Sequence, residues 1–261
     1  GTITKVIRGQ IVDDSLRNVQ DILTAKPYSS DRFHYGGGMV FGPDGKLYVT
    51  IGERYYNEID QPDLPVAQDP TDRRVMIYRL NSDGSVPEDN PDFGEGAAPG
   101  VYAIGIRAAQ GITVHPETGT IWFTEHGSMQ GDEINILKKG ANYGWPIITT
   151  GDYRNEEYEP PTMEGVEFTD PVWYWEETVA PTGLCFYSGE DFPDWQGNLL
   201  VHGLSRGSLW RVIVDGDSVL NAMKVFEEKP IRLRKVAQAP NGKLYLLTDE
   251  SNGRILQIVK E

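Results

Sequence analysis

The chain repeats one short unit, a turn followed by a run of β-favouring residues, and this repeat restricts the fold more than any other feature. Copies of the unit occur at residues 41–50, 114–124, 192–202 and 239–248. Each copy has a turn built on Asp, Asn or Gly, and then a short apolar segment typical of a strand. A further alternating strand is expected at residues 75–80, 133–137, 209–214 and 254–259. The repeat therefore predicts antiparallel hairpins extended to three or four strands.

Repeated units of this kind are typical of the blades of a β-propeller, and long helical periodicity is absent. The last two copies are about one bare blade of ~40–45 residues apart, whereas the earlier intervals leave insertions of roughly 30 residues each. Long insertions on a rigid scaffold are common places for functional sites. We therefore predict an all-β fold, with a single β-propeller domain over residues 1–261.

The beginning of the chain predicts an incomplete blade. Residues 4–12 and 18–24 resemble the two outer strands of a blade whose inner pair is missing. A propeller must close on itself to hide its sheet edges. Either a partial first blade occupies residues 1–25 and N-terminal material is absent from this sequence, or residues 140–180 contain a degenerate blade.

The charge of the chain excludes several classes of partner. Lys and Arg number 24 and Asp and Glu number 39, for a formal net charge of −15. A nucleic-acid binder needs a basic face, and an anionic membrane surface would repel this protein. No apolar run approaches the ~18–20 residues of a membrane-spanning helix. We therefore expect no nucleic-acid partner and no membrane insertion.

Two basic side chains stand in segments of small residues. His34 lies beside Gly36, Gly37 and Gly38, which would let the backbone approach a ligand closely; the alternative is a turn histidine before a strand. Arg107 lies in an apolar stretch and, if buried, must find an anionic or carbonyl partner. That partner is either a ligand or a structural carboxylate.

Two further segments carry charge in a pattern that suits a ligand. Residues 124–135 contain Gly-Ser carbonyls followed by acidic side chains, a set that suits calcium, although an acidic turn is the alternative. Arg232 and Arg234 alternate along a strand and project from the same face, where they repel unless they share an anion. The surface alternative pairs both with Glu227 and Glu228.

The remaining aromatic, histidine and cysteine positions read as structural. Four aromatic residues are expected to pack in the core or at its rim rather than to serve as stacking surfaces: Tyr143, Trp145, Trp173 and Trp175. His115 precedes a proline in a turn and is expected to face solvent. His202 is expected to be a core residue whose hydrogen bonds are satisfied, and Cys185 is expected to be an unreactive buried thiol.

Taken in order, these segments resemble the soluble glucose/sorbosone dehydrogenase family, and especially its aldose sugar dehydrogenase branch. The matching pieces are His34 with Gly37, and residues 41–48 (FGPDGKLY), 81–91 (NSDGSVPEDNP), 105–111 (GIRAAQG), 125–127 (EHG), 132–135 (DEIN), 142–146 (NYGWP), 179–183 (VAPTG), 232–234 (RLR) and 240–242 (PNG). The resemblance implies a six-bladed propeller of the quinoprotein dehydrogenase type that uses pyrroloquinoline quinone (PQQ) and calcium.

The resemblance also implies roles for individual residues. His34 falls on the catalytic base that takes the proton from the C1 hydroxyl of a sugar, and Arg107 on the arginine beside the quinone carbonyls. Thr178, Arg232 and Arg234 fall on cofactor contacts, the two arginines on the cofactor's carboxylates. The metal positions are Gly127 and Ser128, through their carbonyls, and Asp132, through water. The imidazole of His34 and the guanidinium groups of Arg107, Arg232 and Arg234 are expected to line one central well.

The resemblance implies an oxidoreductase that converts an aldose to a lactone and passes electrons to an external acceptor, outside the cytoplasm, as a periplasmic or secreted protein. Ala108 and Ala109 stand where the family usually has Asn-Pro, and Ser128 stands where proline is common. The alternative is therefore a non-catalytic propeller, a binding or scaffold module that has lost the cofactor. A calcium-dependent sugar lactonase would need a ring of carboxylate and Asn ligands, and the sequence displays no such arrangement.

Overall fold

The computed structural model describes residues 1–54, 64–74, 76–205, 207–226 and 231–260. The chain divides into two compact units. Unit 1 consists of Gly1–Ala108, Lys138–Ile148 and Glu157–Thr169, and unit 2 of Ala109–Leu137, Thr149–Glu156 and Asp170–Glu261. Within the described ranges, the strands form five antiparallel sheets and no α-helix is present. The expected single domain over residues 1–261 stays a prediction.

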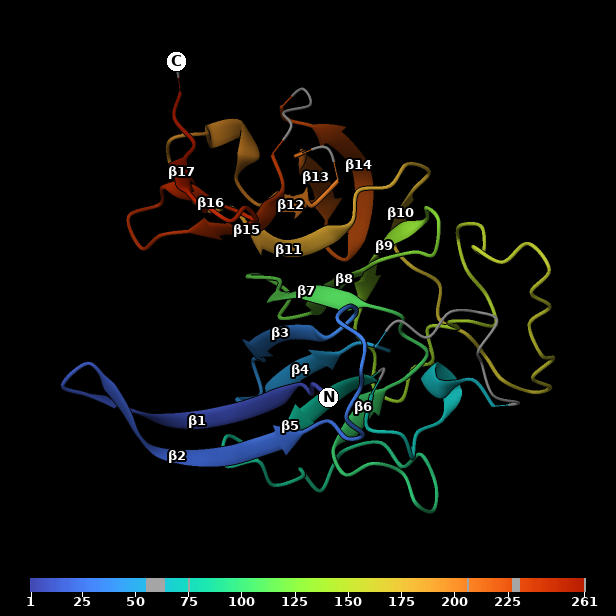
Figure 1. The fold of residues 1–261 in the computed structure, drawn as a ribbon. Helices are drawn as coiled ribbons and strands as arrows, with labels where there is room; N and C mark the ends of the chain where they lie inside the picture. The colour runs from blue at the N-terminus through green and yellow to red at the C-terminus, as the bar shows by residue number, and fades with distance from the viewer. Residues whose placement is uncertain (55–63, 75, 206, 227–230, 261) are drawn as a thin grey trace. The chain divides into compact units, whose positions relative to one another are not determined.

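Unit 1 contains a two-stranded hairpin and a four-stranded sheet (Figure 1). The hairpin pairs β1 (Lys5–Val12) with β2 (Ser15–Thr24). The sheet has the order β3-β4-β5-β6, with bounds Gly36–Phe41, Leu47–Ile51, Met76–Leu80 and Val101–Ala103. A short 3-10 turn, η2 (Val66–Gln68), lies between β4 and β5 in the chain. The hairpin confirms two strands at the start of the sequence, while their role as the outer strands of a partial blade stays a prediction.

The core of unit 1 lies under β4 and β5, because every residue of both strands is buried. Val6 and Leu23 join this core from the base of the hairpin. Farther along the same hairpin, apolar side chains such as Ile11 are exposed. The first two strands are therefore anchored at one end only.

Unit 2 contains three sheets built from consecutive strands. The first has the order β10-β9-β8-β7 and the second β11-β12-β13-β14, whereas the third contains β15-β16-β17. Their bounds, from β7 to β17, are Ala109–Val114, Ile121–Glu125, Asp132–Ile136, Trp173–Trp175, Pro181–Phe186, Leu199–Gly203, Leu209–Asp215, Ser218–Lys224, Leu233–Gln238, Leu244–Thr248 and Ile255–Gln257. The 3-10 turn η3 (Pro193–Trp195) precedes β12. These positions confirm the predicted hairpins and the strands expected after them.

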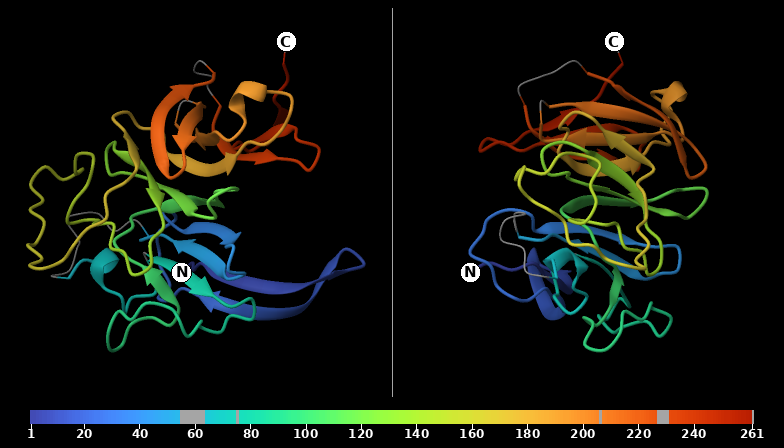
Figure 2. Two further views of the ribbon diagram at one scale, coloured as in Figure 1. Left: turned by 180° about the vertical axis from the view of Figure 1, so that it is seen from behind. Right: turned by 90° about the vertical axis from the view of Figure 1, so that its right-hand side faces the viewer.

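The first strands of these three sheets are neighbours: β11 contacts both β7 and β15 (Figure 2). Glycine permits the close approach of β7 and β11. A Cβ atom on Gly111 would lie only 2.6 Å from side-chain atoms of Leu184 and Thr124 and 3.0 Å from Gly183 Cα. The first strands of the three sheets, β7, β11 and β15, therefore lie next to one another, so that side chains on them can meet.

Residues 140–180 contribute one strand, β10, and it forms the outer edge of the first sheet of unit 2. The alternative of a degenerate blade in this segment is therefore wrong: a three-residue strand can complete an existing sheet but cannot form a sheet of its own. No helix among the described residues is both long enough and apolar enough to cross a membrane.

Candidate functional site

In unit 1, a buried carboxylate holds the histidine of the glycine-rich segment. Glu53 follows β4, His34 precedes β3, and the distance from Glu53 Oε1 to His34 Nδ1 is 3.1 Å. The Glu53 side chain is 1% exposed and the His34 side chain 11%. A carboxylate at Nδ1 favours the tautomer with the proton on that nitrogen, so the lone pair lies on Nε2. This arrangement orients an imidazole that can accept a proton through Nε2.

The same carboxylate joins His34 to Arg107 and Trp145. The Trp145 indole donates to Glu53 Oε2 at 2.7 Å, and Arg107 Nε lies 3.5 Å from Glu53 Oε1 as an ion pair. The Arg107 guanidinium also lies 5.1 Å from the centre of the Trp145 ring. Arg107 is buried, and Glu53 is the anionic partner that its burial requires. The prediction that a buried Arg107 has an anionic partner is confirmed.

The backbone around His34 is held in an uncommon conformation. His34 has φ of 54° and Arg54 has φ of 66°, both in the left-handed region. Arg54 N donates to the His34 carbonyl at 3.1 Å, and Glu53 N donates to the Arg107 carbonyl at 3.1 Å. A side chain on Gly52 would collide with the His34 carbonyl, so the close approach of these two segments requires glycine at that position.

In unit 2, Asp132 accepts hydrogen bonds from two loops, one with the expected metal position Gly127 and one that follows the expected cofactor contact Thr178. Its Oδ1 accepts a hydrogen bond from Gly127 N at 2.9 Å, and its Oδ2 accepts from Val179 N at 2.6 Å and Ala180 N at 2.7 Å. The side chain is buried. Three backbone donors already occupy both oxygens, so Asp132 positions the loops rather than presenting an open carboxylate.

One of the two expected calcium carbonyls, that of Ser128, already accepts a hydrogen bond from a cationic side chain. Arg154 Nε donates to the Ser128 carbonyl at 3.1 Å, and Arg154 N donates to Ser128 Oγ at 3.3 Å. Thr178, the expected cofactor contact, donates its hydroxyl to the Met129 carbonyl at 2.9 Å. Among the described residues, no group of three or more His, Cys, Asp and Glu side chains is arranged to hold a metal ion. In this arrangement, the Arg154 guanidinium occupies the Ser128 carbonyl, so that carbonyl is not open to a calcium ion.

Arg232 and Arg234 share one carboxylate, Asp249. Arg232 Nε lies 3.1 Å from Asp249 Oδ2, while Arg234 contacts both Asp249 oxygens and also donates to Gln110 Oε1 at 3.0 Å. Hydrogen bonds from Arg234, opposed by partial burial and reinforced by Arg232, lower the pKa of Asp249. The predicted shared face is confirmed. The alternative partners Glu227 and Glu228 lie outside the described residues.

This pair fits an anionic ligand. Two guanidinium groups face one carboxylate, so one positive charge is left over, and their side chains are 55% and 43% exposed. Exposed guanidinium forks bind carboxylates well because each offers two parallel donors. These donors therefore suit a ligand that carries several carboxylates, and PQQ is such a molecule.

The structure brings the predicted site residues together in local groups. His34 and Arg107 meet at Glu53 in unit 1, while in unit 2 Asp132 holds the loops that carry the other predicted metal and cofactor positions. Arg232 and Arg234 meet separately at Asp249, and the common well expected for the four basic side chains stays a prediction. Sequence reasoning missed Glu53 and Asp249, the carboxylates that join the cationic side chains. The signal for Glu53 was an acidic residue two positions after a fully buried strand, where a charge needs a partner.

Comparison with known sequences gives a consistent set of relatives. A family model described as Glucose / Sorbosone dehydrogenase matches residues 1–257. Aldose sugar dehydrogenase YliI of Escherichia coli (strain K12) is 36% identical over 98% of this chain, and the match covers 68% of that protein. Quinoprotein glucose dehydrogenase B of Acinetobacter calcoaceticus is 28% identical over 90% of this chain. The match covers 63% of that relative, so the chain spans about two thirds of the length of these proteins.

Solved structures agree with the sequence relatives. The apo-form of the soluble aldose sugar dehydrogenase from Escherichia coli matches 97% of this chain and 72% of that chain, with 33% identity and a TM-score of 0.87. The PQQ-bound aldose sugar dehydrogenase from Streptomyces coelicolor matches 97% of this chain and 71% of that chain, with 26% identity and a TM-score of 0.75. The predicted all-β fold of the propeller dehydrogenase class is confirmed; the closed ring of six blades stays a prediction.

Proposed function

The chain belongs to the glucose/sorbosone dehydrogenase family, and on that premise we propose that it oxidises the C1 hydroxyl of an aldose to a lactone with PQQ as the electron acceptor. The observation that carries the proposal is the contact of His34 with buried Glu53, which also pairs with Arg107. A base and a cation fixed by one carboxylate suit the removal of a proton and the stabilisation of developing negative charge.

His34 is the proposed general base. Glu53 orients the ring through Nδ1, so that Nε2 takes the proton of the sugar C1 hydroxyl. Glu53 also carries the negative charge that stabilises the imidazolium once the proton has moved. The left-handed backbone conformation at His34 restricts the positions that its ring can take.

Arg107 and the paired arginines are the proposed cofactor residues. PQQ, when bound, supplies a quinone that accepts the two electrons and the hydrogen leaving the sugar C1 carbon. Arg107 offers its guanidinium to developing negative charge on the quinone oxygens. Arg232 and Arg234 offer exposed guanidinium groups to the carboxylates, and Thr178 is a further proposed contact.

Calcium is proposed from the family resemblance, through the carbonyls of Gly127 and Ser128 with support from Asp132. Binding at Ser128 would first require the Arg154 guanidinium to leave the Ser128 carbonyl. For that reason, no step of the proposed reaction is assigned to calcium. An external electron acceptor and a periplasmic or secreted location are likewise proposed from the resemblance.

The test measures PQQ binding and sugar-dependent dye reduction in the same preparations. The purified protein, loaded with PQQ in the presence of calcium, should reduce a redox dye when aldoses are added. His34→Asn is the informative variant, because Asn tolerates the left-handed backbone but cannot act as the base. It should bind PQQ and lose turnover. If the protein binds no PQQ and oxidises no aldose, the non-catalytic scaffold is the better account.

A further inference from the structure

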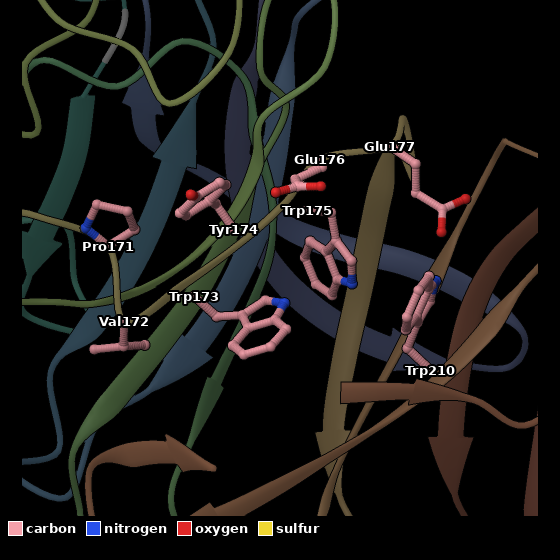
Figure 3. Close-up of a pocket in the computed structure, with 8 residues that line it drawn as sticks. All are labelled: Pro171, Val172, Trp173, Tyr174, Trp175, Glu176, Glu177 and Trp210. Atoms are coloured by element: carbon pink, nitrogen blue, oxygen red, sulfur yellow. The ribbon is translucent and has the colours of Figure 1, made fainter. Parts of the chain in front are cut away.

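A second candidate site lies in unit 2, at the outer strand of its first sheet. A pocket of about 690 Å³ is lined by Trp173, Tyr174 and Trp175 of β10, the following Glu176 and Glu177, and Trp210 of β13. Figure 3 shows the indole rings of Trp173 and Trp175 on the same side of β10, with Trp210 across from Trp175. The volume lies within the range of ~300–1,000 Å³ that is common for small-molecule sites. None of the residues assigned above to catalysis or to PQQ lines this pocket.

The walls of the pocket combine flat apolar faces with carboxylates. The rings of Trp175 and Trp210 are 5.7 Å apart, at an angle of 59°. Lys224 Nζ lies 5.2 Å from the centre of the Trp210 ring and 2.8 Å from Glu177 Oε2. The Lys224 ammonium group therefore already occupies the position beside the Trp210 ring and the Glu177 carboxylate.

Two hydrogen-bond donors in the wall have no partner. The indole nitrogens of Trp173 and Trp175 are buried, and no acceptor lies within hydrogen-bonding distance of either. Trp175 is only 3% exposed, so its N–H is shielded from water. An unsatisfied buried donor costs free energy, and a ligand oxygen entering among the rings could supply the missing acceptor after a small rotation of the indole.

We propose that this pocket binds a neutral saccharide unit. The C–H faces of a sugar ring pack on indole rings, its hydroxyl oxygens accept hydrogen bonds from the indole N–H groups, and its hydroxyl protons suit the Glu176 carboxylate. A purely apolar ligand would leave the two donors unpaired. A quaternary ammonium ion offers them no acceptor either, and an anion would be repelled by Glu176, because Glu177 is already paired with Lys224. The inference does not depend on the proposed oxidation at His34.

The test uses sugars that the proposed dehydrogenase cannot oxidise, because their anomeric hydroxyl is blocked. Methyl β-glucopyranoside and methyl β-cellobioside are titrated into the whole protein while the indole N–H resonances of its six tryptophans are followed by NMR. Single Trp→Phe variants assign the signals. The proposal predicts saturable shifts of the Trp173 and Trp175 signals and no shift for Trp195, which lies in η3 outside the pocket.

Variants then locate the binding site. Trp173→Phe keeps an aromatic ring but removes one donor, so the dissociation constant should rise about five- to tenfold. Tyr174→Ala removes an exposed ring from the pocket wall and serves as a second variant if Trp173→Phe does not fold. Trp195→Phe is the matched control, and it should bind both glycosides like the unmodified protein.

Three results would overturn the proposal. The first is the absence of saturable shifts at glycoside concentrations well into the millimolar range. The second is glycoside binding that survives both Trp173→Phe and Tyr174→Ala unchanged. The third is a titration in which tetramethylammonium shifts the Trp173 and Trp175 signals and the glycosides do not, because that result identifies a cation cage.

Discussion

The carboxylate of Glu53 lies 3.1 Å from His34 Nδ1, in a position where it is almost completely buried. Its second oxygen accepts the Trp145 indole proton at 2.7 Å, so the carboxylate is fixed from both sides. The orientation of His34 therefore depends on a residue that touches neither substrate nor cofactor in the proposed reaction. Glu53 is a positioning residue for the base.

Replacing Glu53 by Gln should lower turnover by about 10²-fold or more. His34 and Trp145 contact different oxygens of the carboxylate, and in Gln one of these oxygens becomes an NH2 group that cannot accept a hydrogen bond. The measurement is dye reduction by PQQ-loaded protein, together with its pH profile, which a purely structural change would not move. Glu117→Gln, at an exposed turn, is the matched control. Turnover equal to that of the unmodified protein would remove Glu53 from the account.

The paired arginines should contribute unequally to PQQ binding. Arg234 is held by both oxygens of Asp249 and by Gln110, whereas Arg232 has one bond to Asp249 and is more exposed. The better-ordered side chain loses less entropy on binding, so Arg234→Gln should weaken PQQ binding about tenfold and Arg232→Gln by less. Calorimetric titration with PQQ measures both constants. The reverse order would contradict the geometric argument.

Removing the Arg154 guanidinium should strengthen calcium binding. In the present arrangement it occupies the Ser128 carbonyl and places a positive charge beside the expected ion. Arg154→Ala should therefore raise the calcium affinity about fivefold or more, corresponding to about 1 kcal/mol. Arg17→Ala, on the exposed strand β2, makes the same change in net charge. Equal calcium affinities in the two variants would show that Ser128 is not a ligand.

His202 should make stability depend on pH. Burial lowers the pKa of His202 to about 3, although its hydrogen bond with the Leu233 carbonyl opposes the shift. The unfolded chain therefore binds the proton first, and stability is lost as pH falls from about 6.5 toward 3, by about 1.4 kcal/mol per pH unit.

His202→Gln removes this titration. Between pH 7 and 5, the free energy of unfolding of the unmodified protein should fall by about 2 kcal/mol more than that of the variant. Denaturant unfolding at a series of pH values measures the difference. Parallel curves for the two proteins would mean that His202 titrates normally in the folded state.

Local patterning was enough to predict most of the fold. Turn residues followed by short β-favouring segments predicted hairpins at 41–50, 114–124, 192–202 and 239–248, and all four hairpins are present. His115 shows where this reasoning was wrong. It was expected to face solvent but is buried, since its Nδ1 accepts from Glu117 N and Thr118 N and its ring packs 4.5 Å from Phe186.

The candidate site could be predicted only in part, because its carboxylates depend on tertiary contacts. Strand alternation predicted one face for Arg232 and Arg234, and both do reach Asp249, although Arg232 precedes β15 and the strand register shifts between Leu233 and Lys235. Nothing in the spacing relates Glu53 to Trp145, ninety-two positions away, or identifies Asp249 as the anion between the arginines. Such partners are chosen by which strand ends meet, and a single sequence carries little information about that.

The most direct test of the account is a single-turnover experiment on PQQ-loaded protein, mixed anaerobically with an aldose and without an external acceptor. The account predicts stoichiometric loss of the oxidised cofactor's absorbance with the unmodified protein. It predicts a rate at least about 10²-fold lower with His34→Asn at equal PQQ occupancy. Equal rates in the two proteins would contradict the assignment of His34 as the base and, with it, the proposed mechanism.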